Sequence, residues 1–254
     1  MAIIQLENVQ VQFVDKGRKF IAVQDCSLSV DENEFVAIVG QSGCGKTTLL
    51  NLVAGFLQPS SGKLFFADEE IQKPGPDRVV VFQEDAVFPW MTVGKNIAYG
   101  LAAKGLSAEQ QEPIVSKYLQ LVGLTGFRNY YPKNLSGGMK KRVDLARAYA
   151  INPKVFLMDE PFGALDSYTR QNMQTELLHL WNADKKTVLF VTHDVSEAIY
   201  MADRIVLMSP RPGKIEQVFM VPFPRPRQKT IRKSPAFLEL QSEIEGWLDH
   251  FEDK

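Results

Sequence analysis

Residues 40–47, with the sequence GQSGCGKT, match the pattern G-x-x-x-x-G-K-[ST] of a loop that binds phosphate groups. The glycines allow backbone N–H groups to point at phosphate oxygens, and a helix beginning here would add its partial positive charge. Lys46 would reach the β- and γ-phosphates of a nucleotide, and the Thr47 hydroxyl would bind Mg²⁺. Cys44 is better interpreted as a small loop side chain than as a reactive thiol. The loop residues predicted to contact a nucleotide are Gly40, Gln41, Ser42, Gly43, Cys44, Gly45, Lys46 and Thr47.

Two adjacent carboxylates, Asp159 and Glu160, follow the apolar run 155–158. Because side chains alternate along a strand, we expect these two to point to opposite sides and to do different work. Asp159 would bind Mg²⁺ through a water molecule, and Glu160 would orient and deprotonate an attacking water. A solvated strand end is the alternative, but the phosphate-binding loop favours phosphoryl transfer to water.

Gln83 and His193 also follow apolar runs. The Gln83 amide would ligate Mg²⁺ or its water and sense a γ-phosphate, although a single glutamine is often an ordinary loop residue. His193 would contact a γ-phosphate, with a structural role as the equal alternative. Phe13 is the first candidate for stacking on adenine and Phe20 the second, and either could instead be a core residue.

A second candidate anion site begins at Ser136. This serine is predicted to cap a helix whose first turn holds Gly137 and Gly138, which leaves backbone N–H groups open to a terminal phosphate. Because the loop at 40–47 already holds phosphates from one side, we expect this helix start to serve the nucleotide of another subunit. Asp166, which follows the acidic pair closely, could also face a neighbouring subunit.

The elements that must position these residues predict an α/β protein. Residues 6–13 alternate in polarity and, with 27–30, indicate antiparallel strands at the N-terminus. A helix is expected over 47–55, and helices starting after Ser107 and Ser136 indicate a helical insert at about 89–150. Short apolar runs typical of parallel strands covered on both faces lie at 35–39, 79–82, 155–158, 188–191 and 205–208.

The end of the chain is predicted to hold a linker and a helix. Residues 222–233 are rich in Pro, Arg and Lys, which indicates an extended linker, and Ser234 and Pro235 begin an amphipathic helix. We expect this helix to pack on the core, with a partner-binding or regulatory role as the alternative. The predicted domains are 1–225 and 226–254.

Composition bounds the classes of function. The chain has 254 residues, 45% hydrophobic and 23% charged, with a formal net charge of −1, which disfavours a nucleic-acid partner. Its two cysteines, Cys26 and Cys44, show no metal-ligand spacing and indicate a reducing compartment. We expect no signal peptide and no membrane-spanning segment, so the protein would be cytosolic or held at a membrane by a partner.

Taken in order, these motifs resemble the ATP-binding subunits of ABC transporters. The resemblance covers about residues 3–220 and rests on the loop at 40–48, Gln83, the signature Leu135-Ser136-Gly137-Gly138-Met139, Asp159 with Glu160, Asp166 and His193. It implies a P-loop NTPase (RecA-like) core with an N-terminal antiparallel β subdomain and an inserted α-helical subdomain, an ATPase activity that requires Mg²⁺, and Thr48 as a further nucleotide contact.

The resemblance also implies partners. It implies a head-to-tail homodimer with two ATPs, each between one subunit's phosphate loop and the other's signature helix. It implies two transmembrane permease subunits whose cytoplasmic helices contact Gln83 and the segment Glu84 to Asn96, and a periplasmic or lipoprotein substrate-binding protein. The subunit would then lie peripherally on the cytoplasmic face of the bacterial cell membrane.

Closer features resemble the nitrate, sulfonate and taurine importers, with the taurine and sulfonate type nearest. They are the sequence SGCGKTTLLN at 42–51, FPW at 88–90, DEPFGALD at 159–166 and SPRPG at 209–213. The implied cargo is a small anion, with bicarbonate or a pyrimidine precursor as alternatives. Met139 departs from the usual final glutamine of the signature, and we expect activity to survive because Ser136 and the glycines carry the implied phosphate contacts.

The chain lacks the features of two rival classes of protein. A soluble ABC ATPase of DNA repair or the ribosome carries a long coiled coil or tandem ATPase domains, for which 254 residues leave no room. A small-molecule kinase would need neither the signature at 135–139 nor a water-directed base such as Glu160.

Overall fold

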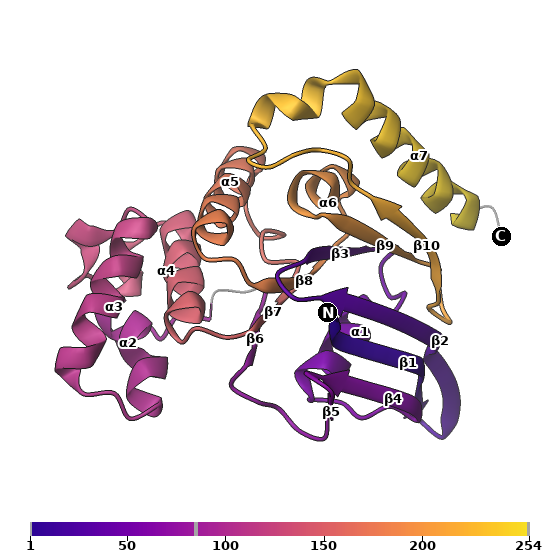
Figure 1. The fold of residues 1–254 in the computed structure, drawn as a ribbon, viewed down its shortest axis with the longest axis horizontal. Coiled ribbons are helices and arrows are strands. Elements are labelled where there is room, and N and C mark those ends of the chain that lie inside the picture. Colours follow the sequence, from indigo (N-terminus) through magenta and orange to yellow (C-terminus); the bar gives the residue numbers. More distant parts are fainter. Residues whose placement is uncertain (1, 84–85, 253–254) are drawn as a thin grey trace. The chain divides into compact units, whose positions relative to one another are not determined.

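The computed structural model describes residues 2–83 and 86–252, without the side chains of Asp15 and Glu252. The chain forms two compact units. The first comprises residues 1–78, 155–160 and 186–254, and the second comprises 79–154 and 161–185. Figure 1 shows the elements of both, with the helices α2, α3 and α4 of the second unit grouped together.

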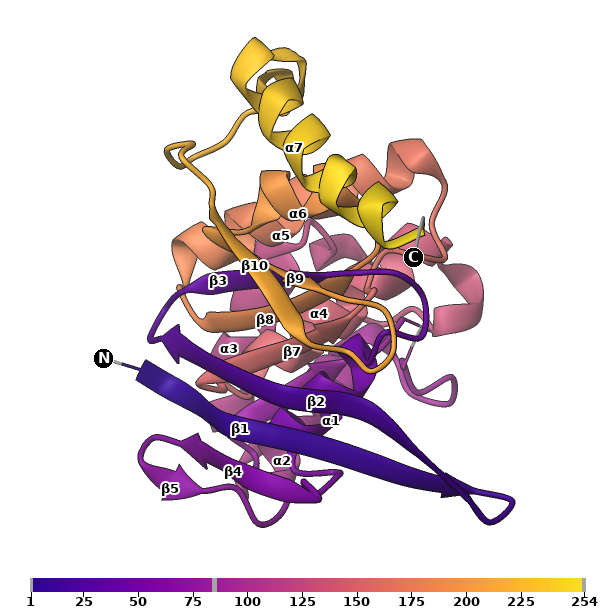
Figure 2. The same cartoon turned by 90° about the vertical axis from the view of Figure 1, so that its right-hand side faces the viewer.

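An antiparallel sheet forms the N-terminal part of the first unit (Figure 2). It consists of β1 (Ala2–Asp15), β2 (Arg18–Asp31), β4 (Ser61–Phe66) and β5 (Glu69–Glu70), in the order β2-β1-β4-β5. Leu6, Val9 and Val11 are all buried, although the three-residue step from Leu6 to Val9 departs from strict alternation; the pairing of β1 with β2 shifts register between these two residues. The expected N-terminal β subdomain is therefore confirmed.

A second, mostly parallel sheet forms the core of the same unit. The strands of this sheet that belong to the first unit are β3 (Phe35–Val39), β7 (Val155–Asp159), β8 (Thr187–Thr192), β9 (Arg204–Met208) and β10 (Ile215–Met220). Their order is β10-β9-β3-β8-β7. Among these five strands, β10 alone runs antiparallel to its neighbour. Every residue of β3 and β8 is buried, because helices α1 (Lys46–Ala54) and α6 (Val195–Met201) pack on these strands.

The second unit is mainly helical. Its helices are α2 (Val93–Ala103), α3 (Ala108–Leu121), α4 (Gly137–Ala150) and α5 (Ser167–Ala183), with 3₁₀ helices at Thr125–Phe127 and Pro132–Asn134. Strand β6 (Arg78–Val81) begins at the boundary of the two units. Ser107 caps α3 in a complete capping box with Gln110, and Ser136 caps α4. Both predicted helix starts are confirmed, and with them the predicted α/β fold.

The segment after β10 differs from a free linker. Arg227 is buried, and its guanidinium donates to the carbonyl oxygens of Ile199, Tyr200 and Ala202 at the end of α6. Residues 229–233 then form a 3₁₀ helix. The richness in proline and basic residues predicted an extended segment, but a guanidinium that donates to the last carbonyl groups of a helix fixes the segment to the core.

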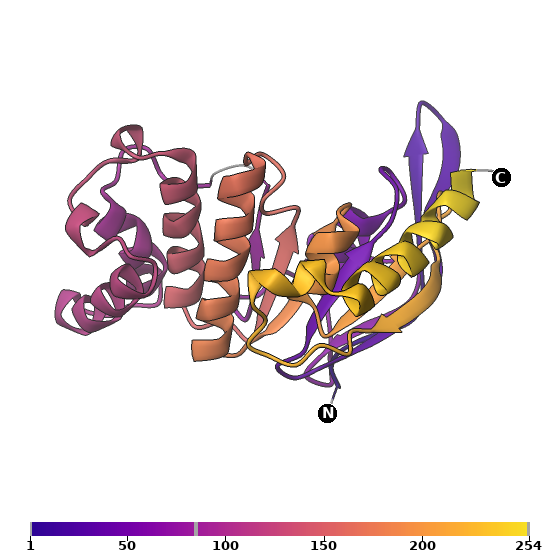
Figure 3. The same ribbon diagram turned by 90° about the horizontal axis from the view of Figure 1, so that it is seen from above.

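Helix α7 (Pro235–Glu252) packs against α6 of the same unit and crosses it at an angle (Figure 3). Phe237 and Ile244 are fully buried, and the Phe237 ring stacks on Phe223 at 5.8 Å between centroids. Gln241 and Leu248, on the face predicted to be apolar, are partly buried. This agrees with the expectation that the helix packs on the core.

We predict that Ile244→Ala destabilises the protein by about 2–4 kcal/mol, because it leaves a cavity beneath α7. Leu238→Ala on the same helix is the control, since Leu238 is 52% exposed and should change stability by less than about 0.5 kcal/mol. Urea unfolding of both variants measures the difference. Equal effects would contradict the packed arrangement and favour a partner-binding role for the helix.

Candidate nucleotide site

The carboxyl ends of β3, β8 and β7 bring the main candidate residues of the first unit together. The parallel register places Val39 opposite Thr192 and Val191 opposite Asp159. The phosphate loop leaves β3, His193 leaves β8, and Asp159 ends β7. Parallel strands explain why residues far apart in sequence meet at one edge of the sheet.

Backbone conformation in the phosphate loop requires glycine at Gly45. Its φ is 104°, and an added Cβ would lie 2.8 Å from Val23 Cγ2 and 3.0 Å from the Ala22 carbonyl oxygen. The loop leads directly into α1, whose first residue is Lys46. Lys46 is only 6% exposed, and its Nζ donates to the carbonyl oxygens of Gly40 (2.7 Å) and Gln41 (2.9 Å). A buried ammonium at a helix N-terminus suits bound phosphate groups.

A cavity of about 250 Å³ adjoins the loop. Its lining extends from aromatic residues of the β1–β2 hairpin to the start of α1, and comprises Phe13, Phe20, Ala22, Ser42, Gly43, Gly45, Lys46, Thr47, Thr48, Glu160 and Arg211. The cavity therefore offers an apolar end and a polar end, as a nucleotide requires. Most of these residues were predicted. Arg211 and Ala22 were missed, because nothing in their local sequence marks a binding residue.

Both aromatic candidates lie at this cavity. Phe13 and Phe20 are paired across the hairpin, and their ring centroids are 5.7 Å apart with the planes tilted by 41°. Both are partly buried, so neither is a simple core residue.

Gly40 and Gln41 line a different cavity of about 220 Å³. His193 is the third residue on the sheet side of this cavity, and α7 supplies the other side with Glu245, Leu248 and Asp249. The carbonyl oxygens of these first two loop residues accept hydrogen bonds from Lys46 Nζ, so their contribution to the phosphate loop is to support Lys46.

Thr47 and Asp159 form the candidate metal site. Thr47 Oγ1 lies 3.2 Å from Asp159 Oδ1. Burial raises the pKa of the Asp159 carboxyl, while the hydrogen bond from Thr47 lowers it. A hydroxyl and one carboxylate next to a phosphate loop are ligands that suit Mg²⁺, which usually completes its shell with phosphates and water. The residues present therefore fit this ion.

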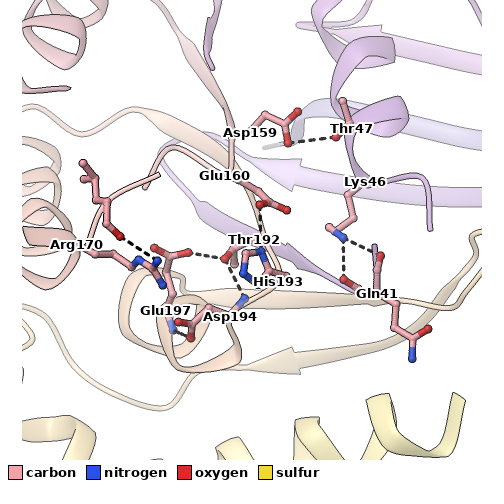
Figure 4. A network of polar contacts seen from close by, with 12 residues as sticks. Gln41, Lys46, Thr47, Asp159, Glu160, Arg170, Thr192, His193, Asp194 and Glu197 are labelled. Atoms are coloured by element: carbon pink, nitrogen blue, oxygen red, sulfur yellow. Dashed lines mark hydrogen bonds and ion pairs between the residues drawn. The ribbon is translucent and has the colours of Figure 1, made fainter. Parts of the chain in front are cut away.

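Glu160 contacts His193 rather than Thr47. The distance from Glu160 Oε2 to His193 Nδ1 is 3.0 Å (Figure 4). The two carboxylates separate as predicted, but alternation along a strand is not the reason. Strand β7 ends at Asp159, and Glu160 has a φ of 43°, in the left-handed region, where a non-glycine residue is strained. This turn directs the Glu160 side chain away from the metal site.

The residues on each side of His193 are fixed by hydrogen bonds (Figure 4). The Thr192 hydroxyl donates to the Glu197 carboxylate and accepts from the Asp194 backbone N–H. The Asp194 side chain caps α6 by accepting from the Glu197 N–H at 2.9 Å. The imidazole itself is 60% exposed, so it is oriented by rigid backbone yet open to a ligand.

The second unit carries the signature residues. The Ser136 hydroxyl accepts from the Met139 N–H at 3.3 Å, as an N-cap does. Ser136 and Gly137 are exposed, and a Cβ added at Gly137 would meet no atom within 4 Å. A Cβ at Gly138 would lie 3.0 Å from Thr169 Cγ2. The start of α4 is thus open, as the prediction of an anion site requires.

Asp166 and Gln83 also belong to the second unit. Asp166 caps α5 by accepting from the N–H groups of Tyr168 and Thr169, and these hydrogen bonds lower the pKa of its carboxyl. Gln83 is exposed and is the second residue after the end of β6. Of the segment Glu84 to Asn96 expected to contact a permease, residues 84 and 85 lie outside the described residues.

Both cysteines are buried within the first unit. Cys44 is 1% exposed, and burial raises the pKa of its thiol. Cys26 is fully buried, and burial raises the pKa of that thiol to about 11. Raised pKa values mean unreactive thiols at neutral pH, in keeping with a small loop side chain at Cys44.

This shift in pKa predicts a loss of stability at high pH. In the unfolded chain the Cys26 thiol releases its proton near its ordinary pKa of 9.0, whereas the folded protein retains it until about pH 11. The free energy of unfolding should therefore fall as pH rises from about 9 to 11, by at most about 1.4 kcal/mol per pH unit from this group. Urea unfolding of wild type and Cys26→Ala across this range measures the contribution as a difference in slope. Parallel pH profiles would contradict it.

Together, the loop at the end of β3, the Thr47–Asp159 pair and the Glu160–His193 pair define a P-loop ATPase. A family model for the ABC transporter matches residues 23–163, and this chain belongs to that family. The resemblance inferred from the motifs is confirmed, and membership makes the protein an ATPase with an ATP-binding cassette.

Similarity extends over nearly the whole chain. The nitrate import ATP-binding protein NrtD of Synechococcus elongatus is 46% identical over 233 residues, which cover 90% of this chain and 85% of that protein. The taurine import ATP-binding protein TauB of Rhizobium johnstonii is 42% identical over 256 residues, with 98% of each chain covered. The dimeric post-hydrolysis structure of the ATP-binding cassette MJ0796 bound to ADP and Pi has a TM-score of 0.74 and 30% identity, and covers 87% of this chain and 99% of that one. Among the described residues, no helix of this protein is long and apolar enough to span a bilayer.

Proposed function

We propose that the protein is the ATP-hydrolysing subunit of an importer for a small anion. Two copies would close around two ATPs and drive a separate membrane permease from its cytoplasmic face. Relatives named for nitrate and taurine import support an anionic substrate, with a sulfonate such as taurine or else nitrate as the main candidates. The permease and a substrate-binding protein outside the membrane would select the cargo.

Hydrolysis is assigned to residues of the first unit. Lys46 would exchange its two carbonyl acceptors for phosphate oxygens, and Thr47 and Asp159 would hold Mg²⁺, which neutralises phosphate charge when bound. Glu160 would orient the attacking water and accept its proton. His193, hydrogen-bonded to Glu160, would contact the γ-phosphate through its other ring nitrogen.

The open start of α4 supports a site completed by a second copy. Backbone N–H groups at an exposed, glycine-containing helix N-terminus favour a terminal phosphate. Ser136, Gly137 and Gly138 would bind the γ-phosphate held by the partner's phosphate loop, with Asp166 facing the same interface. A solved cassette that is dimeric with ADP and Pi agrees with this arrangement. Gln83 is proposed to sense the γ-phosphate and to transmit its presence to the permease.

An exposed aromatic cluster in the second unit carries the proposal of a permease partner. The Phe88 ring lies 4.6 Å from Tyr99 and 5.6 Å from Trp90, between ring centroids. Trp90 is 69% exposed and Tyr99 is 49% exposed. Exposed aromatic residues that already contact one another are typical of the centre of a protein interface.

Helix α4 fixes the backbone that leads to this cluster. Lys141 donates to the Phe82 carbonyl at 2.6 Å, and Arg147 donates to the Ala86 carbonyl at 2.6 Å. Asp144 forms ion pairs with both cations. The helix that begins with the signature therefore holds the chain on both sides of residues 84–85. Through these contacts, α4 would couple nucleotide binding at the signature to the permease.

This function assigns roles to the domains predicted from the sequence. Residues 1–225 would form the ATPase domain, with a helical subdomain at about 89–150, and residues 226–254 would add the connecting segment and α7. The near-neutral net charge supports the absence of a nucleic-acid partner.

Reconstitution tests the proposal. The chain would be co-purified with its permease and binding protein in lipid vesicles, and ATPase stimulation measured with sulfonates, nitrate, bicarbonate and pyrimidines. Trp90→Ala should lose permease binding and stimulation while the free subunit keeps its basal rate. Phe56→Ala, at a residue 55% exposed in the first unit, is the control. Stimulation that survives Trp90→Ala would contradict the docking surface, and no stimulation by any anion would contradict the substrate class.

A further inference from the structure

Arg211 occupies an unassigned position in the nucleotide cavity. It lies between β9 and β10, and it lines the cavity together with the aromatic residues and the phosphate loop. Its guanidinium carbon lies 4.8 Å from the centroid of the Phe20 ring. Its Nη2 also donates to the Gly43 carbonyl at 3.4 Å. The side chain thus bridges the apolar and the phosphate-binding parts of the cavity.

The backbone that carries Arg211 is fixed against the phosphate loop. Gly213 is buried, and a Cβ added to it would lie 1.9 Å from the Cys44 carbonyl oxygen. Its N–H donates to the Ala22 carbonyl at 3.0 Å, and its carbonyl accepts from the Gln24 N–H at 2.9 Å. Because Gly213 has no side chain, its backbone can hydrogen-bond to β2 and pack closely against the phosphate loop. The backbone next to Arg211 is therefore held at the nucleotide cavity, and Arg211 belongs to this site.

From this placement we infer that Arg211 is a nucleotide-binding residue that recognises the ribose and α-phosphate portion of ATP and ADP. That portion joins the base to the terminal phosphates, as Arg211 joins Phe20 to the phosphate loop. A guanidinium has five N–H donors in a planar fork, and the long bond to Gly43 uses one. The others can donate to phosphate or ribose oxygens while the guanidinium stays over the Phe20 ring.

The contact between Arg211 and Phe20 also distinguishes the roles of the two aromatic candidates, Phe13 and Phe20. One face of Phe20 is covered by the guanidinium, which leaves Phe13 as the ring on which adenine stacks. Phe20 then acts as a positioning residue that orients Arg211.

The inference rests on the proposed function only in taking ATP as the ligand, and direct binding tests it. Arg211→Met should raise the Kd of ADP and the KM of ATP about tenfold, with kcat within about twofold, because both nucleotides share the contacted portion. The loss of affinity should shrink at high salt, since an exposed charge is screened. Arg211→Lys keeps the charge but loses the guanidinium fork, so its Kd and KM should lie between those of Arg211→Met and wild type. Arg18→Met, at an exposed residue of the same hairpin, is the control.

Calorimetric titration with ADP and steady-state kinetics give the two readouts, with thermal unfolding beside them. Unchanged Kd and KM in Arg211→Met would overturn the inference. A lower melting temperature with a loss of kcat but not of affinity would overturn it also, by showing a structural role. Failure of the import proposal would appear separately, as wild-type ATPase that no anion stimulates, and would leave ADP binding intact.

Discussion

Glu160→Gln is expected to bind ATP normally and to lose at least about 100-fold in turnover, because removal of a general base typically costs 10²–10⁴ in rate. Glutamine has nearly the shape of glutamate, and its amide can keep a hydrogen bond to His193 Nδ1, now 3.0 Å from Glu160 Oε2. The positions of Lys46 and Thr47 do not depend on this carboxylate. Binding should therefore persist while proton removal from the attacking water fails.

The same variant should accumulate as a nucleotide-bound dimer. When hydrolysis stops, closure around ATP is no longer reversed, so light scattering with ATP and Mg²⁺ should report twice the monomer mass. Glu216→Gln, at an exposed residue of β10, is the matched control for loss of one carboxylate. Turnover by Glu160→Gln at the wild-type rate would contradict the assignment of Glu160 as the general base.

Much of the fold could be predicted because its signals are local. The phosphate loop lies between an apolar run and a helix, and serines mark the starts of α3 and α4. Buried parallel strands appear as continuous apolar runs, as β3 and β8 show. These features need only neighbouring residues to be recognised.

Contacts between distant segments could not be predicted in this way. The burial of Arg227 depends on the end of α6, and the position of Arg211 depends on Phe20 and Gly43. Neither residue differs in sequence from an ordinary surface arginine. The turn at Glu160 was hidden for another reason, since its φ of 43° is uncommon for glutamate and interrupts an otherwise regular strand pattern.

For the signature residues, one predicted role can be seen within a single chain and the other cannot. Sequence predicted the Ser136 cap, and the structure confirms it, but the proposed phosphate contact requires a second copy of the chain. An exposed helix start has no further role within one chain that the described contacts reveal. This makes complementation between two inactive variants the decisive measurement.

A mixture of Lys46→Ala and Ser136→Arg subunits should regain ATPase activity that neither has alone. Lys46→Ala removes the buried ammonium of the phosphate loop, and Ser136→Arg fills the open start of α4. In a mixed head-to-tail dimer, both lesions fall in one site, and the other site combines an intact loop with an intact signature. Random pairing at equal concentrations should restore at most about a quarter of the wild-type sites.

The control is a mixture of Lys46→Ala with the double variant Lys46→Ala/Ser136→Arg. Every dimer then lacks an intact phosphate loop, so no activity should return. Thermal unfolding must show that Ser136→Arg still folds, because losing the N-cap costs about 0.5–2 kcal/mol. If each chain held a complete site of its own, both single variants would stay inactive in any mixture. No recovery in the first mixture would therefore contradict the shared site, whereas recovery there and not in the control requires that one copy's Lys46 act with the other copy's Ser136.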